Sequence, residues 1–320
     1  MKLIDLLMTL QYDFPIDKSP FSKIACRYGI DVDNLISLIR RLRDSGVIRR
    51  IGSVLNYRSR DLKAALVALK VPEPYVEDVS KYINELGGVS HNFLREHEYN
   101  IWFVIKRKNI EDIVKIVKEI CYKYSINKYV VLESTKTYRL DVRFDLYRGI
   151  SRAKILIQNE NPPKLESVSR LPIELLRELC NIEISERPFV KLCEKYNIDE
   201  EYLIEEIKRL ISLNVLRDFY AVLNQERIGF KINAMIILDV DLVDEHVKNI
   251  LNLEEPTHVV YRRFIYGSDK MFEGLYLMIH AVCRDVVQDF IRRNLQKYKF
   301  QIIYSCRNLL PSMPHDIEYT

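Results

Sequence analysis

Two histidines occupy almost the same place in the two halves of this chain, and each lies in a segment with the pattern of a β-strand. His91 and His258 are 167 residues apart, within one residue of the offset at which the chain repeats itself. A histidine titrates near neutral pH and can therefore act as a general acid. A histidine on a strand can equally be a structural residue, so the residues alone leave both interpretations open.

Arginine, aromatic and amide side chains accompany both histidines along the sequence. Arginine binds carboxylates through paired hydrogen bonds, and aromatic and aliphatic walls suit the apolar part of a ligand. Because residues two apart share a face of a strand, side chains on adjoining strands can form one binding surface. The candidate binding residues on these strands are Arg95, Asn100, Trp102, Tyr261, Arg262, Arg263 and His280.

These residues belong to a duplicated chain. Residues 21–56 and 189–224 align without a gap at an offset of 168 residues, with 15 of 36 positions identical. An offset of that size exceeds the roughly 20–50 residues of a solenoid unit. The duplication therefore predicts two tandem halves, each with its own hydrophobic cores.

Each half opens with short helical segments that predict a helix-turn-helix followed by an extended wing. Asp31 and Asp199 stand where a side chain can cap the third helix. Gly46 and Asn214 stand where a left-handed residue would end it. In the first half the predicted helices are residues 4–10, 21–28 and 32–45, and the predicted wings of the two halves are residues 47–57 and 215–225.

After each wing the pattern changes to βαββαβ, the order of a ferredoxin-like domain. The predicted fold class is therefore α+β, a tandem duplication of a winged helix-turn-helix plus a ferredoxin-like domain. The predicted domains are residues 1–60, 61–150, 168–228 and 229–320, joined by a polar, proline-bearing linker at 151–167. Their last strands are expected at 128–132 and 300–304. The segments that follow, 134–139 and 305–308, are either surface loops or flaps that close over a ligand.

The composition indicates an ordinary globular protein, with 48% hydrophobic and 29% charged residues. The apolar runs are far shorter than the roughly 20 residues that span a bilayer, and no signal peptide opens the chain, so we expect a cytoplasmic protein. Six cysteines without a CxxC pair suggest neither a zinc site, an iron–sulfur cluster nor a disulfide framework. A net charge of +4 neither requires nor excludes an anionic partner.

A helix-turn-helix followed by this sandwich is similar to the leucine-responsive (Lrp/AsnC) family of transcription regulators. A recognition helix lies beside two phosphate chains and needs basic or small polar side chains at its N-terminal end. Here that end is acidic in both copies, so DNA binding is expected to be unfavourable. The residues concerned are Asp31, Asp33 and Asn34 in the first copy, and Asp199, Glu200, Glu201, Glu205 and Glu206 in the second.

Several local motifs resemble the siroheme decarboxylase family more closely, with its two related subunits fused in one chain. In the first half they are residues 14–15, 20–21, 46–52, 89–95 and 99–103. In the second half they are residues 187–189, 256–258, 261–263 and 275–280. The second half departs from the pattern at Arg217-Asp218, at Tyr220 and at residues 271–274. Those departures weaken the transfer of ligand contacts to the second wing.

The resemblance implies removal of two acetate carboxyl groups from siroheme to give didecarboxysiroheme, in an alternative route of haem biosynthesis. It implies that His91 and His258 act as proton donor or as axial ligand of the substrate iron. It also adds Arg49 and Arg50 of the first wing as carboxylate-binding residues, and it implies no cofactor beyond the iron of siroheme. The expected partners are the iron tetrapyrrole and the second half of the same chain, with further homodimerisation open. A haem-sensing regulator and a catalytically idle haem-binding scaffold are the alternatives.

Overall fold

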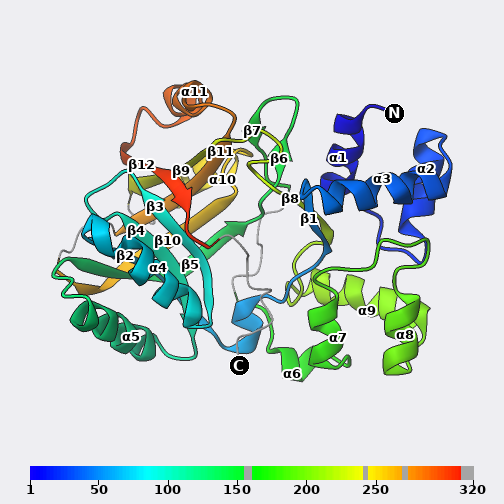
Figure 1. Cartoon of the computed structure of the whole chain (residues 1–320), viewed down its shortest axis with the longest axis horizontal. Helices are drawn as coiled ribbons and strands as arrows, with labels where there is room; N and C mark the ends of the chain where they lie inside the picture. Colours follow the sequence, from blue (N-terminus) through cyan, green and yellow to red (C-terminus); the bar gives the residue numbers. More distant parts are fainter. Residues whose placement is uncertain (155–160, 241–243, 269–272, 311–320) are drawn as a thin grey trace. The chain divides into compact units, whose positions relative to one another are not determined.

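The computed structural model of the chain describes residues 1–154, 161–240, 244–268 and 273–310 (Figure 1). They form two compact units. Unit 1 combines residues 1–60, 143–149 and 161–230, and unit 2 combines the described parts of 61–142, 150–160 and 231–320. Unit 1 therefore holds both helix-turn-helix modules, and unit 2 holds both ferredoxin-like domains. Within the described ranges, no helix is long and apolar enough to cross a membrane.

The two helix-turn-helix modules of unit 1 begin and end their helices as the sequence predicts. The side chain of Asp31 accepts a hydrogen bond from the Asn34 amide at 3.0 Å, and Asp199 accepts one from Tyr202 at 2.9 Å. The predicted left-handed residues after the third helices are confirmed at Gly46, with φ 75°, and Asn214, with φ 57°. The helices are α1 Leu3–Tyr12, α2 Pro20–Tyr28 and α3 Val32–Asp44 in the first module, and α7 Ile173–Glu178, α8 Val190–Tyr196 and α9 Glu200–Ser212 in the second.

The predicted wings are extended, but they do not form a hairpin within each module. Strand β1 Ile48–Gly52 instead pairs antiparallel with β8 Tyr220–Leu223 of the other module. The pairing follows the repeat, because Asn56 N donates to Val215 O at 2.8 Å and Asn224 N donates to Val47 O at 2.9 Å. Each copy thus satisfies the backbone groups that its own wing leaves unpaired.

Residues 143–149, which the sequence assigned to the first ferredoxin-like domain, belong to unit 1. The reason is Arg143, a fully buried side chain that donates to Gln11 O and forms an ion pair with Asp218. The predicted linker at 151–167 is only partly covered, since residues 155–160 lie outside the described ranges. Its described ends carry Ser151 of the short strand β7 Ile150–Ser151 and the start of α6 Leu165–Val168.

The strands of unit 2 close into an antiparallel barrel. Each domain has the ferredoxin-like order, and the domains join at both edges, where β3 pairs with β12 and β5 pairs with β10. No edge of either four-stranded sheet is left open by this arrangement. The first domain contains β2 Lys63–Leu69, α4 Val76–Glu85, β3 Val89–Arg95, β4 Ile101–Arg107, α5 Ile110–Lys123 and β5 Tyr129–Leu140. The second contains β9 Ile232–Asp239, α10 Asp244–Leu251, β10 His258–Gly267, β11 Gly274–Ala281, α11 Arg284–Asn294 and β12 Lys299–Asn308.

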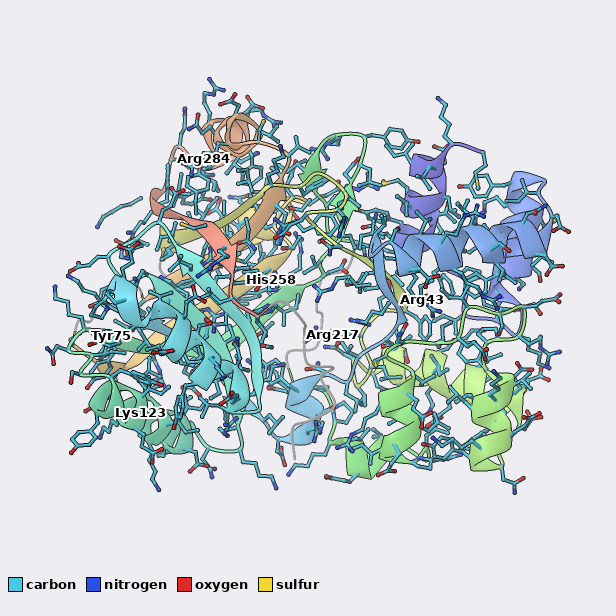
Figure 2. The ribbon with its side chains drawn as sticks, viewed as in Figure 1. Arg43, Tyr75, Lys123, Arg217, His258 and Arg284 are labelled. Carbon is cyan, nitrogen blue, oxygen red and sulfur yellow. The ribbon has the colours of Figure 1, made fainter. Side chains whose placement is uncertain are left out.

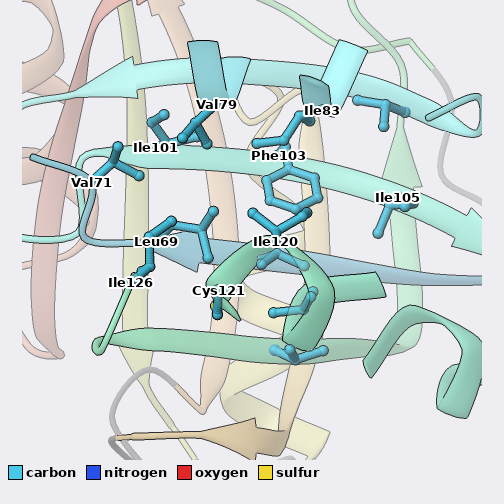
Figure 3. Packing of buried hydrophobic residues seen from close by; sticks show 14 of the residues in the cluster. Leu69, Val71, Val79, Ile83, Ile101, Phe103, Ile105, Ile120, Cys121 and Ile126 are labelled. Carbon is cyan, nitrogen blue, oxygen red and sulfur yellow. The ribbon is translucent and has the colours of Figure 1, made fainter. Parts of the chain in front are cut away.

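Helices cover the outer face of the sheets, and the inner faces pack against each other. Figure 3 shows the outer core of the first domain, where Phe103 of β4 packs against Val79 of α4 and Ile120 of α5. A separate cluster fills the barrel interior with side chains from both copies, such as Trp102 and Tyr276. Burial of this apolar area on both faces stabilises the unit at about 25 cal/mol per Å². The barrel interior is therefore a surface shared by the two halves of the chain.

Candidate active site

The second copy directs His258, Arg262 and His280 toward the barrel interior. In the β10–β11 pairing His258 lies opposite Met278, and Met278 belongs to the interior cluster. Arg262 is four residues further along β10 and His280 two residues further along β11, so alternation puts both on the same face. His258 is labelled in Figure 2.

The same alternation places two other predicted binding residues on the outside of the barrel. Tyr261 packs against the helix-covered core of the second domain. Arg263 is an exposed side chain that pairs with Glu133 at 3.2 Å. Their inclusion in the binding surface is therefore not supported by the register, because neighbours along a strand point to opposite faces.

The first copy brings His91 and Arg95 to the same interior from β3. Phe93, between them on the same face, lies opposite Trp102 of the interior cluster. The ring centroids of His91 and His258 are 6.0 Å apart, with the ring planes at 75°. His91 and Arg95 are each 167 residues before His258 and Arg262. Both copies thus contribute a histidine and an arginine, four residues apart, to one interior surface.

Arg95 is a buried cation without a carboxylate partner among the described residues. Its side chain is 5% exposed and donates long hydrogen bonds, at 3.3 Å to Ile303 O and at 3.4 Å to Asn233 Oδ1. Its Nε is buried without a hydrogen bond, and its guanidinium lies 5.2 Å from the Phe93 ring centroid. Burial lowers the pKa of Arg95 to about 9. An uncompensated buried charge is costly, so this position favours an anionic ligand.

Arg262 occupies the related place in the second copy. It is 9% exposed, donates to Ser134 Oγ at 2.6 Å, and lies 5.3 Å from the Tyr276 ring centroid. Burial raises the pKa of the Tyr276 hydroxyl, so that group stays neutral. Ser134 starts the segment 134–139, which is neither a loop nor a flap but a continuation of β5 along β10. Likewise 305–308 continues β12 along β3.

Comparison with known proteins follows from this geometry. A family model described as the AsnC-like ligand binding domain matches residues 62–139 and 227–310. A model of the siroheme decarboxylase NirDL-like HTH domain matches residues 4–49. The siroheme decarboxylase alpha subunit of Nitratidesulfovibrio vulgaris is 32% identical over 143 residues, which cover 45% of this chain and 79% of that subunit. The chain belongs to the siroheme decarboxylase family.

Other members of the siroheme decarboxylase family match the chain over nearly its whole length. The siroheme decarboxylase of Hydrogenobacter thermophilus is 26% identical over 311 residues, covering 94% of this chain and 91% of that protein. The crystal structure of the siroheme decarboxylase NirDL has the same fold, with a TM-score of 0.64, 24% identity, and coverage of 96% and 91%. Because other members are separate alpha and NirD subunits, the chain is a fused pseudo-heterodimer.

Two residues of the siroheme decarboxylase motif at 99–103 are engaged within the protein. The Asn100 amide donates to Val71 O and accepts from Val71 N, both at 2.8 Å, so it ties the end of β2 to the β3–β4 turn. The Trp102 Nε1 donates to Tyr99 O at 2.6 Å, and the indole is buried in the interior cluster. Asn100 therefore has a structural function, and Trp102 forms the apolar floor beneath the site.

Arg49 and Arg50, the carboxylate-binding residues that the family resemblance adds, lie on β1 in unit 1. Burial and the neighbouring Arg50 lower the pKa of Arg49. Arg50 donates from Nη1 to Cys180 O at 3.0 Å. Their proposed contact with substrate remains a prediction. Two residues that the sequence did not single out also belong to the site, namely Asn233 beside Arg95 and Thr257 beside His258. Thr257 stands in the motif 256–258, which was the only signal for it.

His280 makes the folding stability of the barrel sensitive to acid. Burial first, and then the nearby Arg95 and His91, lower the pKa of His280 from 6.5 to about 3. Below pH 6.5 the unfolded chain takes up a proton that the folded chain refuses. Stability is therefore full above pH 6.5 and falls by up to about 1.4 kcal/mol per pH unit between 6.5 and 3.

We expect His280→Leu to remove that part of the pH dependence. Urea unfolding of both proteins from pH 7 to pH 4 measures it, with the difference between the two curves as the readout. Curves that stay parallel over this range would contradict the assignment, since other titrating groups are common to both proteins.

Proposed function

We propose that this protein is a carboxy-lyase that removes two acetate carboxyl groups of siroheme and yields didecarboxysiroheme. The proposal combines membership of the siroheme decarboxylase family with the interior site of unit 2. It requires no cofactor beyond the iron that siroheme itself carries. The cytoplasmic location expected from the sequence remains a prediction.

Each decarboxylation is redox-neutral. The bond between the acetate methylene carbon and its carboxylate carbon breaks, and carbon dioxide leaves without the bonding electron pair. That pair stays on the methylene carbon and is delocalised into the macrocycle. A proton then forms the new C–H bond and completes a methyl group, so the protein must hold the carboxylates and supply one proton for each turnover step.

The observation that carries the proposal is Arg95. A buried guanidinium with two long hydrogen bonds and no carboxylate partner in the described chain is unfavourable until an anion arrives. A carboxylate of siroheme would accept a bidentate hydrogen bond from it. Arg262 would hold a second carboxylate in the related half, and Arg49 and Arg50 would bind further ones.

His91 and His258 are the proposed source of the proton and the proposed axial ligand of the substrate iron. They lie within the same interior surface as both arginines, and their ring centroids are 6.0 Å apart. A histidine that titrates near neutral pH matches a general acid at physiological pH. Trp102 and Tyr276 supply the apolar surroundings that a flat macrocycle needs.

Incubation of the purified chain with siroheme under anaerobic conditions tests the proposal directly. We expect the tetrapyrrole mass to fall by two carboxyl groups, and carbon dioxide to be released in proportion. The matched control is the double variant His91→Ala with His258→Ala, which keeps both arginines. Siroheme recovered unchanged with the wild-type protein would rule the activity out.

We propose further that duplex DNA is not a partner. Carboxylates gather at the N-terminal end of α9, where Glu200 pairs with Arg187 and Glu201 pairs with Lys18 at 3.1 Å. Like-charge repulsion would oppose a phosphate backbone at this end. A salt-dependent affinity for duplex DNA, with siroheme left unchanged, would favour the regulator instead. Homodimerisation of the fused chain stays open and is measured by the mass of the particle in solution.

A further inference from the structure

Thr257 holds the ring of His258 by a hydrogen bond that decides which nitrogen carries the proton. Thr257 is fully buried, and its backbone N donates to Met278 O at 2.8 Å. Its Oγ1 donates to the same carbonyl oxygen at 3.1 Å and lies 3.0 Å from His258 Nδ1. A carbonyl oxygen can only accept, so the single hydroxyl proton points to Met278. The lone pair of Oγ1 therefore faces Nδ1, and Nδ1–H is the donor.

This contact fixes the tautomer of the neutral imidazole. A neutral histidine carries one N–H, and placing it on Nδ1 leaves the lone pair on Nε2. A nitrogen with its lone pair in the ring plane binds iron, whereas it delivers no proton until the ring takes up a second one. Residues that fix a ligand histidine in this way also raise its basicity.

The first copy has a hydroxyl at the same place but does not use it in the same way. Ser90 precedes His91 as Thr257 precedes His258, and it is likewise buried. Over the described part of the chain, its hydroxyl makes no hydrogen bond to His91. The strand pairing is irregular here, with a register shift between Val89 and His91. The two copies therefore present chemically unequal histidines to one interior surface.

We propose that Thr257 is a positioning residue that presents Nε2 of His258 to the substrate iron, so that His258 is the axial ligand and His91 delivers the proton. This inference rests on the proposed function. It divides two roles that the pseudo-symmetry of the repeat leaves equivalent, and it ascribes the division to one buried hydroxyl.

The tautomer is measured in the substrate-free full chain by ¹⁵N NMR of the histidine rings, above the pH at which the rings are protonated. We expect His258 to show the Nδ1–H form in the wild type and in Thr257→Ser. Thr257→Val keeps the shape, removes the hydroxyl, and should shift His258 toward the Nε2–H form. Ser90→Ala, the matched change in the first copy, should leave the spectrum of His258 unchanged. A wild-type ring in the Nε2–H form overturns the proposal.

Ligand binding separates an effect on iron from a general loss of structure. Iron uroporphyrin III and metal-free uroporphyrin III share the carboxylates and differ in the metal. Thr257→Val should weaken the iron form about 10- to 100-fold, with Thr257→Ser restoring it. The metal-free form should bind all variants alike.

Equal losses for both tetrapyrroles would make Thr257 structural only and would overturn the inference while the proposed function stands. Failure of the wild type to bind either tetrapyrrole would refute the proposed function, and with it the ligand role of His258. The tautomer measurement needs no tetrapyrrole, so its result distinguishes the two failures.

Discussion

Replacing His91 by alanine is expected to slow decarboxylation of siroheme by about 10²–10⁴-fold, the range that a positioned general acid contributes. The carboxylates would still be held by Arg95 and Arg262, so KM should change little. His258→Ala should also slow turnover sharply, and it should in addition change the absorbance of the bound iron tetrapyrrole, because the proposed ligand is lost. Single-turnover rates with a full absorbance spectrum of each complex measure both effects.

Ser90→Ala is the control for these variants, since it removes a buried side chain next to His91 without touching an imidazole. Circular dichroism and urea unfolding should show that both histidine variants remain folded. Rates equal to the wild type in both variants would remove the two histidines from catalysis. A rate loss in His258→Ala with an unchanged spectrum would leave catalysis intact as an idea but remove the ligand role.

Arg95→Met is expected to change binding and stability in opposite directions. Loss of the guanidinium should weaken siroheme binding by about 2–5 kcal/mol, roughly 30- to 4000-fold in Kd. The substrate-free protein should become more stable, by about 1–4 kcal/mol, because methionine fills a similar volume without a buried charge. Binding titration and urea unfolding at neutral pH give the two numbers.

Arg263→Met is the matched control, since it makes the same change on the outer face, at an exposed arginine that pairs with Glu133. Surface changes of this kind usually alter stability by less than about 0.5 kcal/mol, and we expect siroheme binding to be unchanged. A destabilised Arg95→Met protein would mean that the guanidinium is compensated within the protein. Unchanged binding would remove Arg95 from the substrate site.

Local sequence patterns were sufficient for the elements of each half. Helical spacing and the caps at Asp31 and Asp199 placed the third helices, and the change to the pattern of strands indicated the ferredoxin-like domains. These features depend on residues within a few positions of each other, so a single sequence records them. The gapless repeat of 36 residues then required that whatever forms in one half forms in the other.

The faces of the strands were only half determined. Alternation shows that Arg262 and His258 share one face and that Tyr261 and Arg263 share the other. It does not say which face is turned to the barrel interior, because β10 carries apolar residues on both. The answer came from packing, with Tyr276 and Met278 of β11 beside the first pair and the helix-covered core beside Tyr261.

By itself, the sequence determined a duplicated chain of helix-turn-helix and ferredoxin-like parts, with a histidine at corresponding places. Only the tertiary structure decided that β1 pairs with β8, that β5 and β12 extend along the strands of the other copy, and that this closure brings His91 to His258. The physical reason is that backbone hydrogen bonds between strands carry no residue identity, so the partner of an edge strand is chosen by which surfaces pack together.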